Sequence, residues 1–154
     1  YAHVKLEITN LPKLLIIGEG EERNYLTKKI RENNLENDVF LLGYKNNIFQ
    51  YLNKSLFFIL SSDWEDPGFV LVEAAASNKL ILSSDVLSGP KEFLCNKSSG
   101  FLYEKESFKD FKNKIKHILN DTNSKEIYFK RINAKKNSRN YTIFHHYKEL
   151  SKLL

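Results

Sequence analysis

The sequence has little that would cross-link the chain or place it in a membrane. Its 154 residues include one cysteine, Cys95, which excludes an internal disulfide framework and is typical of a reducing compartment. The longest apolar run, residues 56–60, has the length of a strand, whereas a transmembrane helix needs about 20 such residues. No basic, apolar and small-residue pattern of a secretory signal opens the chain. Together these absences favour a cytoplasmic protein.

Repeats and metal-ligand patterns are missing as well. The chain has no internal repeat and no low-complexity segment, so a single domain over residues 1–154 is predicted. The four histidines show no metal-ligand spacing with carboxylates or with the cysteine, so we expect no metal centre. They are His3, His117, His145 and His146. The first residue is Tyr1 rather than methionine, and we expect the chain to be a piece of a longer protein.

The composition is that of a globular domain with a basic surface. The apolar share is 42% and the charged share is 28%, and a chain of this length buries roughly two-thirds of its unfolded surface. The net charge of +5 comes from scattered lysines, which predict a solvated surface in the first place. The basic stretch from Lys109 onward leaves open a peripheral contact with acidic membrane lipid. It lacks interleaved aromatic platforms, so no nucleic-acid partner is expected.

Short apolar runs alternate with longer amphipathic stretches, and this alternation predicts a parallel sheet covered by helices. Strands are expected at 13–17, 38–42, 56–60, 80–82 and 100–103, and helices at 21–34, 48–53, 69–77, 89–95, 108–119 and 124–154. Residues 56–60 are apolar on both faces, which indicates a central strand. Ser107, with Asp110 three residues later, predicts an acidic variant of the capping box. The predicted fold is a doubly wound α/β domain, whose ligands bind beyond the carboxyl ends of the strands.

The turn Gly18-Glu19-Gly20 follows the first clear strand and opens a helix. In this context glycines let a phosphate approach backbone N–H groups. The third glycine of the dinucleotide fingerprint is absent, and two glutamates at the helix start would repel a diphosphate. A tight turn with acidic residues that suit the helix dipole explains most of the pattern, so NAD binding is not expected.

Residues 65–73 are more informative. Gly68 permits a ligand to approach the backbone, and the helix that begins there offers free N–H groups and the positive end of its dipole. Glu65 precedes this helix, and Glu73 lies little more than one turn inside it. Amides for phosphates and carboxylates for hydroxyl groups would suit a sugar linked to a diphosphate. On spacing alone, a helix cap and a surface glutamate explain the segment equally well.

Four blocks of the sequence follow one another in an order and spacing that match those of one protein family. They are residues 14–20, residues 39–44, residues 61–74, and the pair 83–85 and 89–92. The third block contains two glutamates separated by seven residues. Together the blocks resemble the donor domain of glycosyltransferase family 4, whose enzymes have two Rossmann-like domains (the GT-B fold). The resemblance covers about residues 11–103 and implies the C-terminal, nucleotide-sugar-binding half.

The resemblance implies a role for each matching residue. Glu65 would be the catalytic residue, contacting hydroxyl groups of the donor sugar near the reacting carbon. Glu73 would hold the ribose hydroxyl groups, and Gly18 would pass close to the diphosphate. The family transfers a sugar with retained configuration and usually needs no bound metal, so no cofactor is expected besides the nucleotide-sugar substrate. The protein would stabilise an oxocarbenium-like sugar and a departing diphosphate.

The remaining implied contacts surround the diphosphate and the base. Gly68, Phe69 and Val70 would offer backbone N–H groups to the sugar and diphosphate. Leu71 would line the ribose and diphosphate pocket. Tyr44 or its neighbour Lys45 would lie beside the nucleobase.

The chain departs from the family at its start. The family's first donor-domain strand, with a glycine and an arginine, and the lysine of the following helix have no match here. Residues 1–10 resemble the tail of the family's first helix, although Val4, Leu6 and Ile8 alternate as in a strand. The Rossmann-like core is then residues 11–104, and residues 105–154 are C-terminal helices. The amino-terminal acceptor domain is missing too, so the chain alone is expected to be inactive.

Three functions remain open. The first is the donor-binding domain of a retaining glycosyltransferase that moves a sugar, expected from a UDP-sugar, to a glycan, lipid-linked or protein acceptor. The second is a non-catalytic nucleotide-binding or interaction module. The third is a nucleotide-sugar epimerase of the same two-domain shape, which ranks last because such enzymes lack a matching pair of glutamates.

Overall fold

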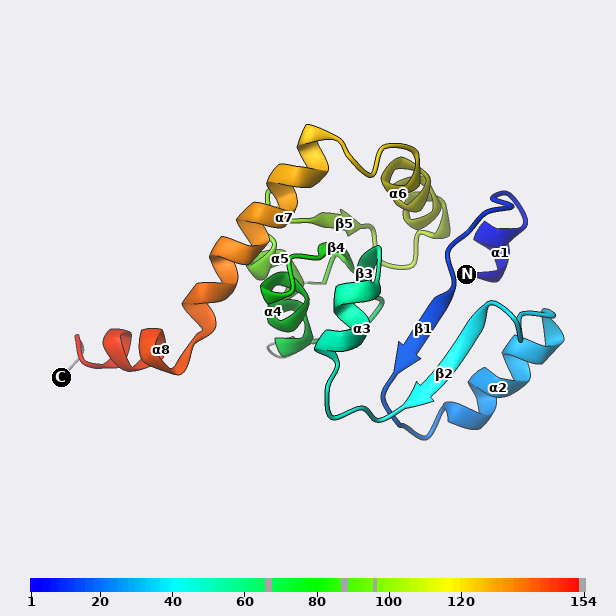
Figure 1. Cartoon of the computed structure of the whole chain (residues 1–154), viewed down its shortest axis with the longest axis horizontal. Helices are drawn as coiled ribbons and strands as arrows, with labels where there is room; N and C mark the ends of the chain where they lie inside the picture. Colours follow the sequence, from blue (N-terminus) through cyan, green and yellow to red (C-terminus); the bar gives the residue numbers. More distant parts are fainter. Residues whose placement is uncertain (66–67, 87–88, 96, 153–154) are drawn as a thin grey trace. The chain divides into compact units, whose positions relative to one another are not determined.

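The computed structural model describes residues 1–65, 68–86, 89–95 and 97–152. Asp66 and Pro67, between the two glutamates of the candidate site, lie outside the described residues. The chain divides into two compact units, Tyr1–Ile48 (unit 1) and Phe49–Leu154 (unit 2). Each unit contains parallel strands joined by helices, which confirms the predicted α/β architecture (Figure 1).

Unit 1 is a strand–helix–strand motif preceded by one short helix. Its elements are α1 (Ala2–Lys5), β1 (Leu14–Ile17), α2 (Arg23–Glu32) and β2 (Val39–Gly43). The strands are parallel and pair Leu14 with Val39 and Ile17 with Gly43. No residue of α2 is buried, so the helix covers the two strands only thinly.

Unit 2 holds the larger sheet and most of the helices. Its elements are α3 (Phe49–Lys54), β3 (Phe57–Leu60), α4 (Phe69–Ala76), β4 (Leu80–Ser84), α5 (Pro90–Phe93), β5 (Phe101–Tyr103), α6 (Phe108–Asn120), α7 (Lys125–Ser138), the 3₁₀ helix η1 (Arg139–Tyr141) and α8 (Ile143–Leu150). The expected strands and helices are confirmed to within a few residues. The long helix expected over residues 124–154 is divided at η1.

The strand order in unit 2 corrects one prediction. The sheet is parallel with the order β3–β4–β5, so β4 rather than the strand at residues 56–60 is central. All five residues of β4 are buried, whereas only Leu60 of β3 is. An apolar run reports that both faces of a strand are covered by other layers. It does not report whether a hydrogen-bonded strand lies on each side, and this is why the prediction failed.

The core of unit 2 lies between its sheet and the helices α4, α6 and α7. Leu71, Ala74 and Ala75 of α4 are buried, as is Ala134 of α7, and these two helices pack side by side (Figure 1). Small side chains at the contact allow the two helices to approach closely. The Arg131 guanidinium of α7 adds a hydrogen bond of 2.9 Å to the Asn78 carbonyl that follows α4.

The cap of α6 confirms one half of a prediction and corrects the other. The Ser107 hydroxyl accepts a hydrogen bond of 3.3 Å from the Asp110 N–H, as the capping box requires. The Asp110 carboxylate, however, accepts from the N–H of Glu104 at 2.9 Å rather than from that of Ser107. The chain turns just before the helix, at Glu106 with its positive φ of 63°, and this turn brings the earlier N–H within reach.

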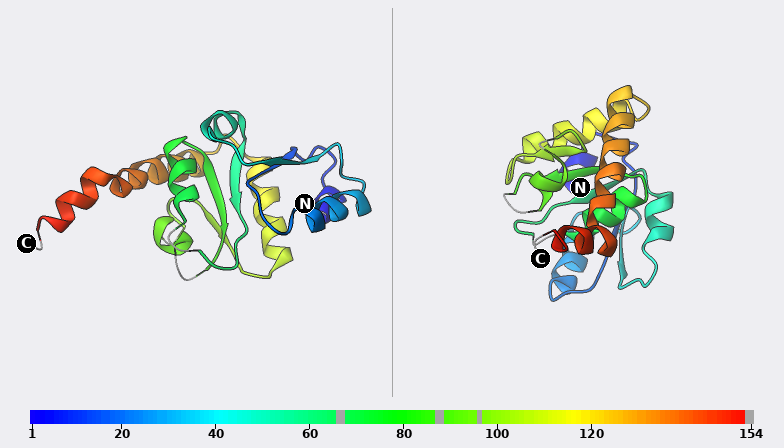
Figure 2. Two further views of the ribbon diagram at one scale, coloured as in Figure 1. Left: turned by 90° about the horizontal axis from the view of Figure 1, so that it is seen from below. Right: turned by 90° about the vertical axis from the view of Figure 1, so that its left-hand side faces the viewer.

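The last helix, α8, extends away from the sheet of unit 2 and packs mainly on η1 (Figure 2). Its apolar residues Ile143, Phe144 and Tyr147 are exposed, and Ile143 is 92% exposed. In the part of the chain that the structure describes, no helix has both the length and the apolar character to cross a membrane.

Candidate functional site

The loop after β3 carries Glu65 and leads to α4. Glu65 is half-buried, and the Ser62 hydroxyl donates a hydrogen bond of 2.5 Å to its Oε1 atom. Gly68 is the N-cap of α4 and adopts the left-handed conformation, with φ 73° and ψ 49°. A Cβ atom at Gly68 would lie 3.5 Å from Glu65 Oε2, which is an ordinary contact. Glycine is therefore favoured here by its backbone conformation rather than by lack of space.

The first turn of α4 presents backbone N–H groups. Its N-cap has no side chain to accept from them, and no acidic residue lies in this turn. The Leu71 N–H donates to the Gly68 carbonyl at 2.9 Å, so the N–H groups that lack an intrahelical acceptor belong to Phe69 and Val70. The side chains of these two residues are exposed, whereas Leu71 is fully buried. The positive end of the helix dipole would favour an anion at this place.

Glu73 lies one turn inside α4 and is half-buried. No hydrogen bond or ion pair to its carboxylate is found among the residues that the structure describes. The next two residues, Ala74 and Ala75, are fully buried, so the carboxylate stands at the margin of the core. Its oxygens are not among the buried side-chain atoms that lack a hydrogen-bond partner, so they remain accessible. A ligand with hydroxyl groups could therefore donate hydrogen bonds to this carboxylate.

Hydroxyl groups connect the carboxyl ends of the three strands in unit 2. The Ser84 hydroxyl, at the end of β4, donates a hydrogen bond of 2.6 Å to the Ser62 carbonyl, just after β3. Ser84 is also the side-chain hydrogen-bond partner of Tyr103, at the end of β5. Burial raises the pKa of the Tyr103 hydroxyl above its ordinary value, and the hydrogen bond with Ser84 opposes this rise.

These three residues are not among those predicted for the site. Ser62 and Ser84 stand at or just beyond the ends of neighbouring strands, and this position is the signal in the sequence that points to them. Nothing in the sequence singles out Tyr103, because its hydroxyl reaches Ser84 only through the pairing of β4 with β5.

The segment after β4 adds charged groups to the same edge of the sheet. The Asp85 N–H donates to the Tyr103 carbonyl at 2.8 Å, and the Asp85 carboxylate lies 3.7 Å from the Lys91 ammonium. Gly89, with a positive φ of 77°, is the N-cap of α5. These residues belong to the fourth block of the sequence resemblance and lie beyond the carboxyl end of β4, as predicted.

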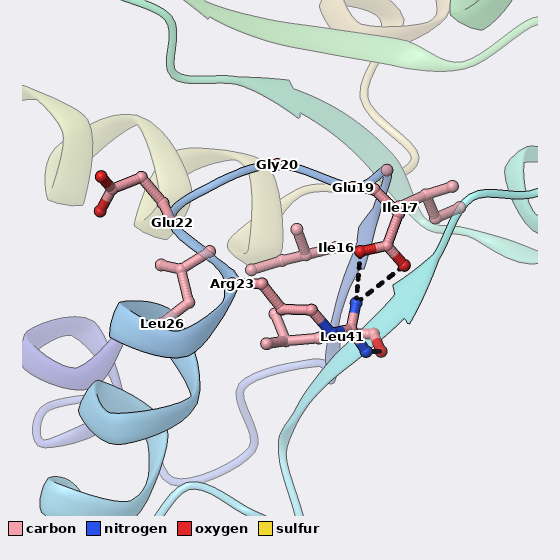
Figure 3. A pocket seen from close by; sticks show the side chains of 9 residues that line it. Ile16, Ile17, Glu19, Gly20, Glu22, Arg23, Leu26 and Leu41 are labelled. Atoms are coloured by element: carbon pink, nitrogen blue, oxygen red, sulfur yellow. Dashed lines mark hydrogen bonds and ion pairs between the residues drawn. The ribbon is translucent and has the colours of Figure 1, made fainter.

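In unit 1 the turn after β1 borders a hollow of about 200 Å³ between the sheet and α2 (Figure 3). The Arg23 guanidinium donates to both carboxylate oxygens of Glu19, at 3.1 and 3.2 Å, and to the Leu41 carbonyl at 3.3 Å. Gly18 has a φ of 130°, and its N–H donates to the Gly43 carbonyl at 3.0 Å. The negative charge of Glu19 is therefore balanced by Arg23.

The predicted site residues fall into two groups. Gly18, Tyr44 and Lys45 lie at the carboxyl ends of the strands in unit 1; Tyr44 is 74% exposed and Lys45 is half-buried. The other group lies beyond β3 in unit 2 and consists of Glu65, Gly68, Phe69, Val70, Leu71 and Glu73. The structure brings the members of each group together within their own unit. The role assigned to each residue stays a prediction.

In the described ranges, no group of three or more His, Cys, Asp or Glu side chains is placed to hold a metal ion.

Known proteins resemble this chain in sequence and in structure. It is 33% identical, over 83% of its length and 34% of the relative's, to an N-acetylgalactosamine-N,N'-diacetylbacillosaminyl-diphospho-undecaprenol 4-alpha-N-acetylgalactosaminyltransferase of Campylobacter jejuni. A crystallised mutant of Staphylococcus aureus TarM in complex with UDP is 27% identical, with a TM-score of 0.79 over 88% of this chain and 27% of that one. Anabaena HepE in complex with UDP has a TM-score of 0.84 at 21% identity, over 99% of this chain and 43% of HepE.

The match to a protein family extends over most of the chain. The chain spans 20%, 24% and 34% of the lengths of three curated relatives, which are all named as glycosyltransferases. The family model "Glycosyl transferases group 1" matches residues 2–140 and so includes both groups of predicted site residues. This chain belongs to the group 1 family of glycosyl transferases.

Proposed function

We propose that residues 1–154 act as one donor-binding domain of a retaining glycosyltransferase. The enzyme would move a sugar from a nucleotide diphosphate, a UDP-sugar, to a glycan, lipid-linked or protein acceptor. Membership of the group 1 family supports this proposal, as do relatives named as glycosyltransferases and similar structures that contain UDP. Because the chain spans a small part of its relatives, an amino-terminal acceptor domain would be the partner, and the chain alone would be inactive.

The observation that carries the proposal is the half-buried Glu73 carboxylate, which lies one turn inside α4, a helix whose N-cap provides no side-chain hydrogen bond. A nucleoside diphosphate sugar presents groups that suit both features. Its phosphates would accept hydrogen bonds from the Phe69 and Val70 N–H groups, and its ribose hydroxyl groups would donate to Glu73. Glu65, which precedes Gly68 in the sequence, would then accept hydrogen bonds from the hydroxyl groups of the sugar.

The chemical task is to stabilise charge as the bond between sugar and diphosphate breaks. The α4 N-terminus would favour the departing diphosphate, because its dipole and N–H groups are fixed before the reaction begins. The Glu65 carboxylate would favour the positive charge that develops on the sugar ring. No bound metal is part of this proposal.

Titration calorimetry of the chain with UDP, GDP and UDP-sugars tests the proposal. Saturable binding of one nucleotide that Glu73→Gln weakens would support it, and the identity of that nucleotide would name the base. The substitution keeps the shape of the side chain and removes its charge. Glu36→Gln, at an exposed position in unit 1, is the matched control. Binding that Glu73→Gln leaves unchanged would show that the donor site lies elsewhere.

The alternative is a non-catalytic nucleotide-binding or interaction module. The two proposals make different predictions once the chain is joined to an amino-terminal domain of a relative. A transferase half would restore hydrolysis or transfer of a UDP-sugar, whereas a binding module would bind the nucleotide without turnover.

Peripheral contact with acidic membrane lipid is a further proposal. Residues 125–152 contain eight lysines and arginines against two glutamates, whereas the whole chain has 24 basic against 19 acidic residues. α8 combines exposed Ile143 and Phe144 with basic neighbours, a pattern typical of helices that lie in a membrane interface. Sedimentation with anionic vesicles, but not with neutral ones, would support this contact, and loss on Phe144→Glu would assign it to α8.

A further inference from the structure

A chain of hydrogen bonds runs from the strand ends of unit 2 through the residue Ser62 to the Glu65 carboxylate. The Ser62 hydroxyl donates to Glu65 Oε1 at 2.5 Å, while the Ser62 carbonyl accepts from the Ser84 hydroxyl at 2.6 Å. Ser84 in turn has the Tyr103 hydroxyl as its side-chain partner. Ser62 is therefore held on its backbone side and uses its side chain to hold the carboxylate.

Burial makes this arrangement rigid. Ser84 is only 2% exposed and Tyr103 is 8% exposed, so both residues are largely shielded from bulk water. Hydrogen bonds of this kind are stronger in a low-dielectric interior than in water. The next peptide of the loop is held as well, because the Lys105 ammonium donates to the Asp63 carbonyl at 3.4 Å. The backbone on which the Ser62 hydroxyl stands is thus fixed from β4 and from the segment after β5.

We propose that Ser62, Ser84 and Tyr103 are positioning residues that hold the Glu65 carboxylate ready for the donor sugar. The proposal rests on the function proposed above for Glu65. Ser62 acts directly on the carboxylate, Ser84 acts through the Ser62 carbonyl, and Tyr103 acts through Ser84. The expected effects therefore decrease in that order.

Ser83 provides a matched control. It neighbours Ser84 on β4, is fully buried, and its hydroxyl donates only to the Ser84 carbonyl at 3.3 Å in the described part of the chain. Ser83→Ala and Ser84→Ala therefore remove the same atom from the same buried strand. Only the second substitution removes a hydrogen bond to the loop that carries Glu65.

The first measurement compares the affinities of UDP and UDP-glucose for each variant by calorimetry. Ser62→Ala should weaken the binding of UDP-glucose relative to UDP about tenfold, and Ser84→Ala about threefold, which is the range that the loss of one hydrogen bond gives. Tyr103→Phe should lower the affinity for UDP-glucose relative to UDP about twofold, and Ser83→Ala should leave this ratio of affinities unchanged. Ser84→Thr, which keeps the hydroxyl group, should have the same ratio as the wild-type chain. Equal weakening of UDP and UDP-glucose by Ser84→Ala would overturn the proposal, since a merely structural role predicts that result.

The second measurement needs no ligand. In carboxyl-detected NMR of the ¹³C-labelled chain, the Glu65 side-chain carbon resonance should move in Ser62→Ala and Ser84→Ala but not in Ser83→Ala. An unmoved resonance in Ser84→Ala would overturn the proposal even if nucleotides bind. A wild-type chain that binds no nucleotide would count against the proposed function, while this resonance would still decide whether the serines hold Glu65.

Discussion

The two units hold their candidate site residues in different ways. In unit 2 the loop with Glu65 stands on a fully buried strand, β4, and is tied to it by a buried hydroxyl group. In unit 1 the turn with Gly18 lies beside α2, a helix without a buried residue. The carboxylate of this turn, that of Glu19, accepts hydrogen bonds from the exposed Arg23. A functional side chain is fixed only as well as the layer that supports it. Unit 2 therefore presents a preorganised surface, whereas the surface of unit 1 depends on weaker contacts.

The largest difference should appear in the cores of the two units. Leu82 on β4 is fully buried, whereas Leu15 on β1 is 43% exposed. Leu82→Ala should lower the free energy of unfolding by about 2–5 kcal/mol because it leaves a cavity. Leu15→Ala should lower it by less than about 1 kcal/mol. Denaturant unfolding of both variants checks this, and similar losses would show that unit 1 is as well packed as unit 2.

The second difference concerns the charge of one glutamate in each unit. Glu73→Gln should weaken nucleotide binding roughly 10- to 100-fold, because hydrogen bonds to a charged group contribute about 1.5–3 kcal/mol. Glu19→Gln should cause no loss, because Arg23 already balances the charge of Glu19. Calorimetric titration of the two variants side by side measures this. A loss at Glu19 as large as that at Glu73 would place a direct ligand contact in unit 1.

The third difference concerns backbone conformation at two glycines. Gly68 has a φ of 73°, so Gly68→Ala should destabilise unit 2 by about 1–2 kcal/mol, even though a Cβ atom would meet only ordinary contacts. Gly20 in unit 1 has open space around it and no positive φ, so Gly20→Ala should change stability by less than about 0.5 kcal/mol. Thermal unfolding of both variants measures the two losses of stability. An unaffected Gly68→Ala chain would show that the loop before α4 relaxes freely.

The smallest effect should come from Arg23. Its ion pair with Glu19 is exposed, and such pairs contribute about 0.2–1 kcal/mol. Arg23→Ala should lower stability by no more than this amount, and by less at high salt, because salt screens exposed charges. Unfolding at low and high salt tests the expectation. A larger loss that does not depend on salt would assign the role of Arg23 to its hydrogen bond with the Leu41 carbonyl.

The sequence predicts the elements of this fold better than their neighbours in the sheet. Apolar runs locate β1 to β5 because alternation and run length report burial of a strand's faces. Apolar runs do not predict that β3 is an edge strand of its sheet, because the pairing of strands depends on residues distant in sequence. The pair of Arg23 with Glu19 is visible as an i, i+4 spacing, so its balancing of the acidic turn could be anticipated.

The site is predicted in the same uneven way. Glu65, Gly68 and Glu73 stand out because they share one short segment with unusual residue types. The hydrogen bonds of Ser62, Ser84 and Tyr103 that lead to Glu65 do not stand out in the sequence. They depend on the register that sets Leu60 beside Ser83 and Ser84 beside Tyr103. Serines occur at many loop positions for other reasons. Only the three-dimensional pairing of β3, β4 and β5 distinguishes these from the rest.

The attachment of α8 has a consequence for proteolysis and for divergence between relatives. The helix packs mainly on η1, and the family match ends at residue 140, before α8 begins. Trypsin should therefore cut at the exposed Arg139 and release α8 while the core up to Ser138 resists digestion. For the same reason, substitutions in α8 meet few constraints from the core. This helix is the part of the chain that relatives can change most freely to suit a different location or partner.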